Sequence, residues 1–178
     1  MKKNILIFGL ISGTIVSVFM GVSMVLCYNK NSYSGNMVLG YTMMLLAFAF
    51  VFVGIKNYRD KFNGGLISFG EAFKVGSLIA LVASTMYVIT WLIVYYNFIP
   101  DFMDKYSAHI INDAKAAKVS QADLDKQIAQ MDSMKRIYKN PFGVILFTYL
   151  EILPLGLIVA LISSLILKKK EIKVSPTA

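Results

Sequence analysis

Four long apolar runs constrain this chain more than any other feature of its sequence. They cover about 5–27, 37–55, 75–99 and 142–167. A helix needs roughly 20 apolar residues to cross the hydrocarbon core of a bilayer, and hydrocarbon offers no partner for a bare peptide group. Each run is therefore predicted to be a transmembrane helix. The predicted fold class is an all-α membrane protein, a single domain over 1–178 in which the four helices form a compact bundle.

Composition indicates a lipid-embedded protein rather than a nucleic-acid binder. Hydrophobic residues make up 57% of the chain and charged residues 16%, a balance that does not keep a soluble domain dispersed. The net charge of +8 does not indicate nucleic acid, because the basic residues flank the apolar runs. The first run is too long for a signal peptide and lacks a small-x-small cleavage site, so we expect it to be an uncleaved first span.

The basic residues predict the orientation in the bilayer. With four spans, both termini and the segment between the second and third runs lie on one side of the membrane. That side carries ten of the eighteen basic residues: Lys2, Lys3, Lys56, Arg59, Lys61, Lys74, Lys168, Lys169, Lys170 and Lys173. The other side carries Lys30 and a long segment, 100–141, whose seven basic and six acidic residues nearly balance. By the positive-inside rule, both termini are expected in the cytoplasm.

The segment between the third and fourth runs is predicted to form two amphipathic helices over about 101–139. Apolar residues recur there at helical spacing. They are Phe102, Tyr106, Ile110, Ala114 and Ala117 in the first half, and Leu124, Ile128, Met131 and Tyr138 in the second. Between the halves, Ser120 stands three residues before Asp123, which is typical of a helix start. The two helices form a hairpin or lie along the membrane surface. They serve either as a lid on the bundle or as a docking platform.

Small residues spaced by four predict where the helices approach one another closely. The hydrophobic drive between helices is small in lipid, so close backbone contact through small side chains matters. The stripes are Gly9, Gly13, Ser17 and Gly21 in the first run, Gly76, Ala80 and Ser84 in the third, and Gly156, Ala160 and Ser164 in the fourth. We expect them to pack the four spans against one another, and the alternative is that they pair two copies of the chain.

Glu151 is the one charged residue inside an apolar run, and it is the sharpest candidate for a functional role because a carboxylate in a spanning helix is costly. Its place in the run puts it in the outer part of the hydrocarbon core. Thr148 and Pro154 share its helix face. The outer half of the third run supplies candidate hydrogen-bond partners: Tyr87, Thr90 and Tyr95. This polar notch is either a structural cluster or a transport site that holds a proton or a ligand.

Other polar features have structural explanations. The glycine-rich segment 64–74 fits neither phosphate-loop pattern, whereas Ser68 and Glu71 fit a capping box that starts the third helix. Cys27 and His109 are the only cysteine and the only histidine, so no metal site is predicted. The sequence contains no recognisable set of nucleophile, base and acid and no nucleotide motif. It therefore predicts no cofactor and no enzyme.

With these residues in view, the chain resembles an uncharacterised family of four-span membrane proteins from Bacteroidota, the domain of unknown function 4199. The likeness covers most of the chain. It rests on Tyr58-Arg59 with Gly64-Gly65, the segment from Ser68 to Gly76, Tyr95-Tyr96, Pro100-Asp101-Phe102, and Glu151-x-x-Pro154-x-Gly156 with Ser163, Ser164 and the terminal lysines. The resemblance implies a bacterial inner-membrane location and supplies no activity.

Two functions are open at this point. The leading hypothesis is a non-enzymatic accessory or scaffold subunit that packs against other membrane proteins or against itself, because packing features are abundant. The alternative is a small proton-coupled transporter in which Glu151 is the coupling carboxylate. Such a transporter would be oligomeric, since four spans enclose little volume.

Overall fold

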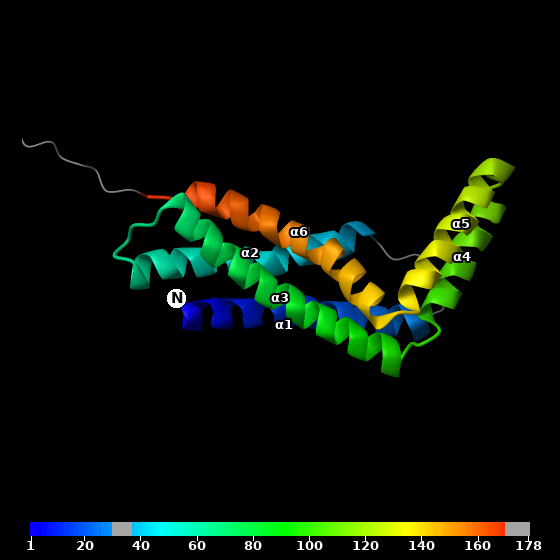
Figure 1. Ribbon diagram of the computed structural model, residues 1–178, viewed down its shortest axis with the longest axis horizontal. Coiled ribbons are helices and arrows are strands. Elements are labelled where there is room, and N and C mark those ends of the chain that lie inside the picture. Colours follow the sequence, from blue (N-terminus) through cyan, green and yellow to red (C-terminus); the bar gives the residue numbers. More distant parts are fainter. Residues whose placement is uncertain (30–36, 170–178) are drawn as a thin grey trace, which may run out of the picture.

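The computed structural model describes residues 1–29 and 37–169, and over these residues it contains six α-helices (Figure 1). Four long helices lie side by side in one bundle: α1 (Lys2–Asn29), α2 (Met37–Phe62), α3 (Phe69–Asn97) and α6 (Pro141–Leu167). Two shorter helices, α4 (Phe102–Ala116) and α5 (Gln121–Tyr138), form a hairpin at one end. The all-α fold with four long helices and a helical hairpin is confirmed. Lys30, Lys170 and Lys173, on which the orientation prediction partly rests, lie outside the described residues.

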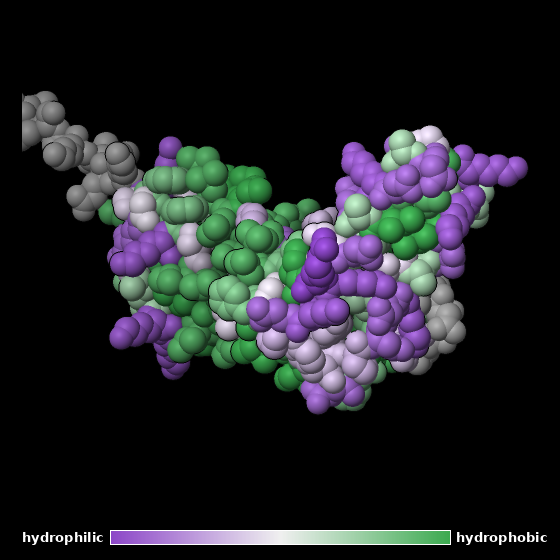
Figure 2. Space-filling view, turned by 45° about the vertical axis from the view of Figure 1, so that its right-hand side comes forward, coloured by the Kyte–Doolittle hydropathy of each residue, from purple (hydrophilic) through white to green (hydrophobic). Residues whose placement is uncertain are grey.

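The four long helices have the character of membrane spans. Each contains a segment with a mean hydropathy between 2.1 and 2.4 and is long enough to cross a bilayer. Large apolar side chains face outwards around the bundle, for example Leu46, Ile89 and Ile158. Figure 2 shows apolar residues over the bundle and hydrophilic residues over the hairpin and the opposite end. A soluble monomer does not expose apolar surface on this scale, and the protein is therefore a multi-pass membrane protein.

Helix ends extend past the apolar runs. The second run stops at Ile55, but α2 continues to Phe62, and its last turn carries Arg59 and Lys61, whose charges favour the negative end of the helix dipole. Side-chain oxygens cap the starts of α3, α5 and α6. They accept from backbone N–H groups in the pairs Ser68–Glu71, Ser120–Asp123 and Asn140–Phe142. Local chemistry at the membrane boundaries thus fixes where these helices begin.

The small-residue stripes lie inside the bundle. A Cβ atom added to Gly9 would lie 2.7 Å from the Val82 Cβ, so α1 and α3 approach closely. A Cβ added to Gly76 would lie 3.0 Å from that of Ala160, which brings α3 equally close to α6. Gly21 differs from the other glycines of its stripe, because a Cβ there would meet nothing within 4 Å. The close packing of α1 therefore loosens toward the hairpin end.

Polar side chains join neighbouring helices within the span region. The Asn4 amide donates to the Gly54 carbonyl at 2.9 Å, and the Ser12 hydroxyl donates to the Ala47 carbonyl at 2.7 Å, so that α1 is bonded to α2 twice. Both side chains are buried. Lipid offers no competing partner for these groups, which makes the bonds specific for this pairing of helices.

Candidate functional site

The hairpin end of the bundle contains an open cavity of about 740 Å³. All four long helices and both hairpin helices line it, for example Met20 of α1, Met44 of α2, Tyr87 of α3, Met134 of α5 and Glu151 of α6. Figure 2 shows the surface hollowed where the hairpin leaves the bundle. This concave feature joins the spanning helices to the hairpin, and it contains the membrane carboxylate singled out by the sequence.

Glu151 stands in the wall of this cavity. It lies ten residues after Pro141, the start of α6, which at 1.5 Å per residue is about 15 Å along the helix and well inside the span. Its side chain is exposed and lines the cavity. Among the described residues, no side chain forms a hydrogen bond or an ion pair with its carboxylate. A carboxyl group in this position lies in a wall made mostly of apolar and aromatic side chains.

The other predicted members of the polar notch separate into two groups. Thr148 and Tyr87 are buried and line the cavity with Glu151. The Thr148 hydroxyl is already satisfied, because it donates to the Val144 carbonyl at 2.7 Å. Pro154 is exposed on the outer face of α6, away from the cavity lining.

Thr90 and Tyr95 do not reach Glu151 either. Thr90 donates to the Met86 carbonyl of its own helix at 2.9 Å. Tyr95 does not itself line the cavity, and its ring lies 5.5 Å from that of Tyr138, which does. The structure therefore brings together Glu151, Thr148 and Tyr87 without linking them by hydrogen bonds.

An aromatic cluster fixes the base of the hairpin on the bundle. The Phe102 ring of α4 meets Trp91 of α3 edge-on at 5.4 Å, and the Tyr138 ring of α5 meets Phe147 of α6 at 6.2 Å. Such edge-to-face pairs add specific geometry to apolar burial. Burial raises the pKa of Tyr138 to about 12, and the nearby charge of Glu151 adds to this effect. Tyr138 is thus a neutral phenol at physiological pH, held in place above the carboxylate's cavity.

A second contact holds α4 against α1. The Lys105 ammonium lies 2.9 Å from the Asp101 carboxylate and 4.0 Å above the centre of the Tyr28 ring. The hydrogen bond within this pair lowers the pKa of Asp101 and raises the pKa of Lys105. His109 lies further along α4 beside Asp113 at 3.2 Å. These charges are therefore compensated within the hairpin and its contacts.

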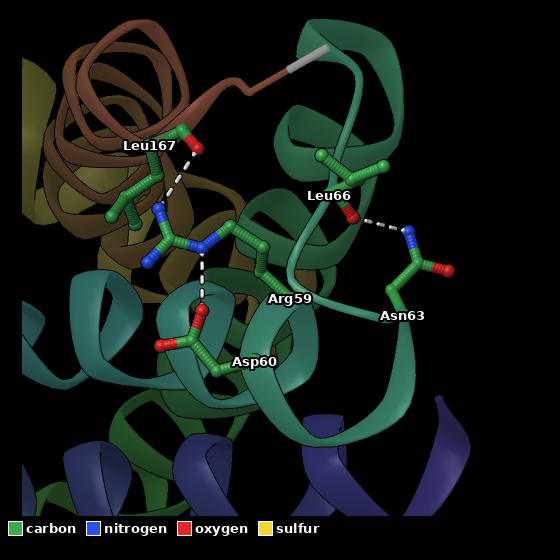
Figure 3. A network of polar contacts seen from close by, with 5 residues as sticks. All are labelled: Arg59, Asp60, Asn63, Leu66 and Leu167. Atoms are coloured by element: carbon green, nitrogen blue, oxygen red, sulfur yellow. Dashed lines mark hydrogen bonds and ion pairs between the residues drawn. The ribbon is translucent and has the colours of Figure 1, made fainter. Parts of the chain in front are cut away.

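The opposite end of the bundle carries a polar network that joins α2, the loop after it, and the end of α6 (Figure 3). Arg59 forms an ion pair with Asp60 at 2.6 Å and donates to the Leu167 carbonyl at 3.2 Å. Ile67 and Lys169 form an isolated antiparallel bridge, with reciprocal backbone bonds of 3.0 and 2.9 Å. The network holds the loop after α2 against the end of α6, and we interpret it as a stabilising part of the fold.

Glu71 has a different role from the one its spacing predicts. Its backbone N–H is capped by Ser68, but its carboxylate does not complete the reciprocal half of a capping box. The carboxylate instead accepts from the Tyr58 hydroxyl at 3.1 Å and from the Asn63 amide at 3.0 Å. Glu71 therefore contributes to the start of α3 through its backbone N–H and holds the end of α2 through its carboxylate.

Sequence reasoning missed several residues that the structure uses. Asn4 stands just before the first run and Ser12 lies within it, and their spacing by eight, which places them on one helix face, was the available signal. Gly54 belongs to no predicted stripe, yet a Cβ there would lie 3.0 Å from the Phe8 Cβ. The cavity itself had no sequence signal, because its walls come from six helices.

A family model described as a protein of unknown function, DUF4199, matches residues 7–169. The chain belongs to this family. The match covers all of α2 to α6 and most of α1, so the cavity and the polar network both lie in the DUF4199 region. No curated protein and no solved structure matches the chain.

Proposed function

We propose that this protein is a non-enzymatic accessory or scaffold subunit of the bacterial inner membrane, and that it docks on another membrane protein through its hairpin. The observation that carries this proposal is the shape of the hairpin. Its base rests on the bundle, while the rest of α4 and α5 projects away and packs only on itself (Figure 1). Two short helices that pack only on each other bury little apolar surface, so a partner surface would stabilise the exposed part.

The burial pattern of the hairpin supports docking over a simple lid. Beyond the base, Ala114 and Met131 are the buried apolar residues among those described. Small residues such as Ala122 and Ala129 are exposed and would let a partner helix approach closely. The base still roofs the cavity through Phe102 and Tyr138. The hairpin would therefore combine both roles, a roof at its base and a platform toward its tip.

Co-purification tests this proposal. The tagged protein is isolated at endogenous expression from native membranes in mild detergent, and its partners are identified by mass spectrometry. We expect a stoichiometric membrane protein that is lost in Ala129→Glu, because a charge on the exposed face blocks close helix contact. Gln130→Glu adds the same charge at the next exposed position and serves as the matched control. Recovery of the protein alone in both cases would refute the accessory role.

A proton-coupled transporter is the second candidate, and the position of Glu151 in the cavity wall favours it. A carboxylate inside a span is a typical coupling group. Flux assays in proteoliposomes with an imposed proton gradient address this role. Proton-driven flux that survives Glu151→Gln would exclude Glu151 as the coupling group, and the absence of flux in the unaltered protein would leave the accessory role in place.

A further inference from the structure

The cavity at the hairpin end has an unusual lining for a gap between membrane helices. Five of the described residues that line it are methionines, and seven are aromatic. The methionines are Met20, Met24, Met44, Met103 and Met134. Methionine side chains are flexible and polarizable, and surfaces rich in them adapt to apolar ligands of varied shape. A volume of about 740 Å³ lies within the usual range for small-molecule sites.

The charge of the lining is one-sided. Glu151 is the single acidic residue among the described residues that line the cavity, and no lysine, arginine or histidine stands among them. Lys105, on the adjacent face of α4, is held by Asp101 and the Tyr28 ring instead. In its ionised form, a carboxylate with no cationic partner among the described lining residues attracts a positive charge.

The aromatic residues favour the same kind of ligand. Tyr87 and Trp91 of α3, Tyr106 of α4 and Tyr138 of α5 all line the cavity. Aromatic faces attract cations, and groups of aromatic rings are the usual recognition site for quaternary ammonium groups. Carboxylate and rings therefore select for positive charge, while the methionines accept an apolar body.

The cavity opens toward the lipid. Leu150 of α6 and Tyr41 of α2 both line it, and both are exposed on the outer surface of the bundle, at 63% and 46% respectively. Part of the cavity wall therefore belongs to the outer surface of α2 and α6, which faces the lipid. A ligand that is dissolved in the membrane can reach this part of the wall.

We propose that this cavity binds a lipophilic cation, an apolar molecule with one positive charge, which places its charge against Glu151 and its body among the methionine and aromatic side chains. This inference is independent of the accessory role, since it concerns the interior of the bundle and not the outer face of the hairpin. It names a chemical class of ligand for the membrane carboxylate.

Two probes of similar shape and opposite charge test the proposal. The full chain is placed in phosphatidylcholine nanodiscs, and binding of tetraphenylphosphonium and of tetraphenylborate is measured by equilibrium dialysis against empty nanodiscs. Trp91 is the only tryptophan of the chain and lines the cavity, so its fluorescence reports whether the probe enters there. We expect saturable binding of the cation with a change in Trp91 emission, and no saturable binding of the anion.

Two variants, each with a control, distinguish the role of the Glu151 charge from that of the cavity volume. Glu151→Gln keeps the shape and removes the charge, and we expect it to weaken cation binding about tenfold or more. Asp113→Asn removes one charge from an exposed position of the hairpin and should leave binding unchanged. Gly40 lines the cavity with open space beside it, so Gly40→Leu should narrow the site and weaken binding. Gly70→Leu, at an equally open position at the other end, is its matched control.

Each contrary result overturns the proposal. Equal binding of the cation to Glu151→Gln, or equal binding of both probes, would show that charge plays no part. A phospholipid that co-purifies and is not displaced by the cation would show that a lipid chain fills the cavity. Binding that is absent in the unaltered protein while two copies of the chain associate through this face would assign the cavity to an interface.

Discussion

Arg59 donates from its guanidinium to the main-chain carbonyl of Leu167 at 3.2 Å, and this bond joins the end of α2 to the end of α6. The carbonyl belongs to the last turn of α6 and has no partner within its own helix. Arg59, at the end of the second span, therefore supplies the hydrogen-bond donor for a carbonyl at the end of the fourth span. Beside this contact, the reciprocal backbone bonds between Ile67 and Lys169 join the loop after α2 to the residues after α6, and Figure 3 shows the Arg59 bond between the two helices.

Replacing Arg59 should destabilise the bundle. Arg59→Ala leaves the Leu167 carbonyl without its bond and removes the pair with Asp60, and we expect a loss of about 1–2 kcal/mol in the free energy of unfolding. Denaturant unfolding in detergent micelles measures this loss. Lys61→Ala removes an exposed charge two residues away and should change stability by less than about 0.5 kcal/mol. Equal effects of both changes would contradict the structural role of Arg59.

Gly9 and Gly21 form a matched pair within one stripe. Gly9→Ala places a Cβ 2.7 Å from the β-branched centre of Val82, which cannot rotate away, so we expect a loss of about 1–3 kcal/mol. Gly21→Ala meets nothing within 4 Å, and it should be neutral or stabilise the helix by about 0.5–1 kcal/mol. Thermal unfolding in detergent compares the two variants. A larger loss at Gly21 would indicate that the stripe faces a second copy.

Ser12 and Ser17 test the hydrogen bonds between helices. Ser12→Ala removes the bond to Ala47, and we expect a loss near 0.6 kcal/mol and at most about 1.7 kcal/mol. The Ser17 hydroxyl is buried without a partner among the described residues, so Ser17→Ala should be neutral or stabilising. Unfolding free energies of the two single variants decide the question. The prediction fails if Ser17→Ala costs as much as Ser12→Ala.

The Asp101–Lys105 pair predicts how the hairpin's attachment depends on pH. The pKa of Asp101 is lowered, so its contribution is complete above 3.8, the ordinary pKa of an aspartate, and is lost as the pH falls through the pKa of the folded state. The pKa of Lys105 is raised, so its contribution is complete below 10.5 and is lost as the pH rises through the folded value. The hydrogen-exchange protection of α4, corrected for the intrinsic exchange rate at each pH, should therefore be constant between these limits and fall below pH 3.8. In Asp101→Asn, exchange should be faster in the middle range and lack the acid step.

Cysteine labelling tests the proposed orientation. In a Cys27→Ser background, Ser133→Cys places a thiol on the exposed face of the hairpin, and Lys61→Cys places one at the other end. If both termini are cytoplasmic, a membrane-impermeant maleimide labels the hairpin thiol in spheroplasts and labels the other only after lysis. The reverse pattern would place the hairpin in the cytoplasm.

Parts of this structure could be predicted from local sequence because their causes are local. An apolar run of about 20 residues has one stable form in lipid, and a serine before an acid three residues on starts a helix at Ser68 and Ser120. The partners of Glu71 could not be predicted in this way. Tyr58 and Asn63 reach its carboxylate because the loop folds α2 back toward α3, and many loop paths would satisfy the same sequence.

The sequence by itself determined that four helices span a bilayer, that a hairpin stands between the last two, and that one carboxylate lies within a span. Hydropathy, helical period and cap chemistry act over one turn or one run of residues, so they do not depend on which other helices pack against that segment. Only the tertiary structure decided that Glu151 lines a cavity with Tyr87 and Met134 rather than bonding to Thr90 or Tyr95. The reason is geometric, because a cavity is the space left over when six helices settle against one another, and that space depends on their crossing positions more than on any single residue.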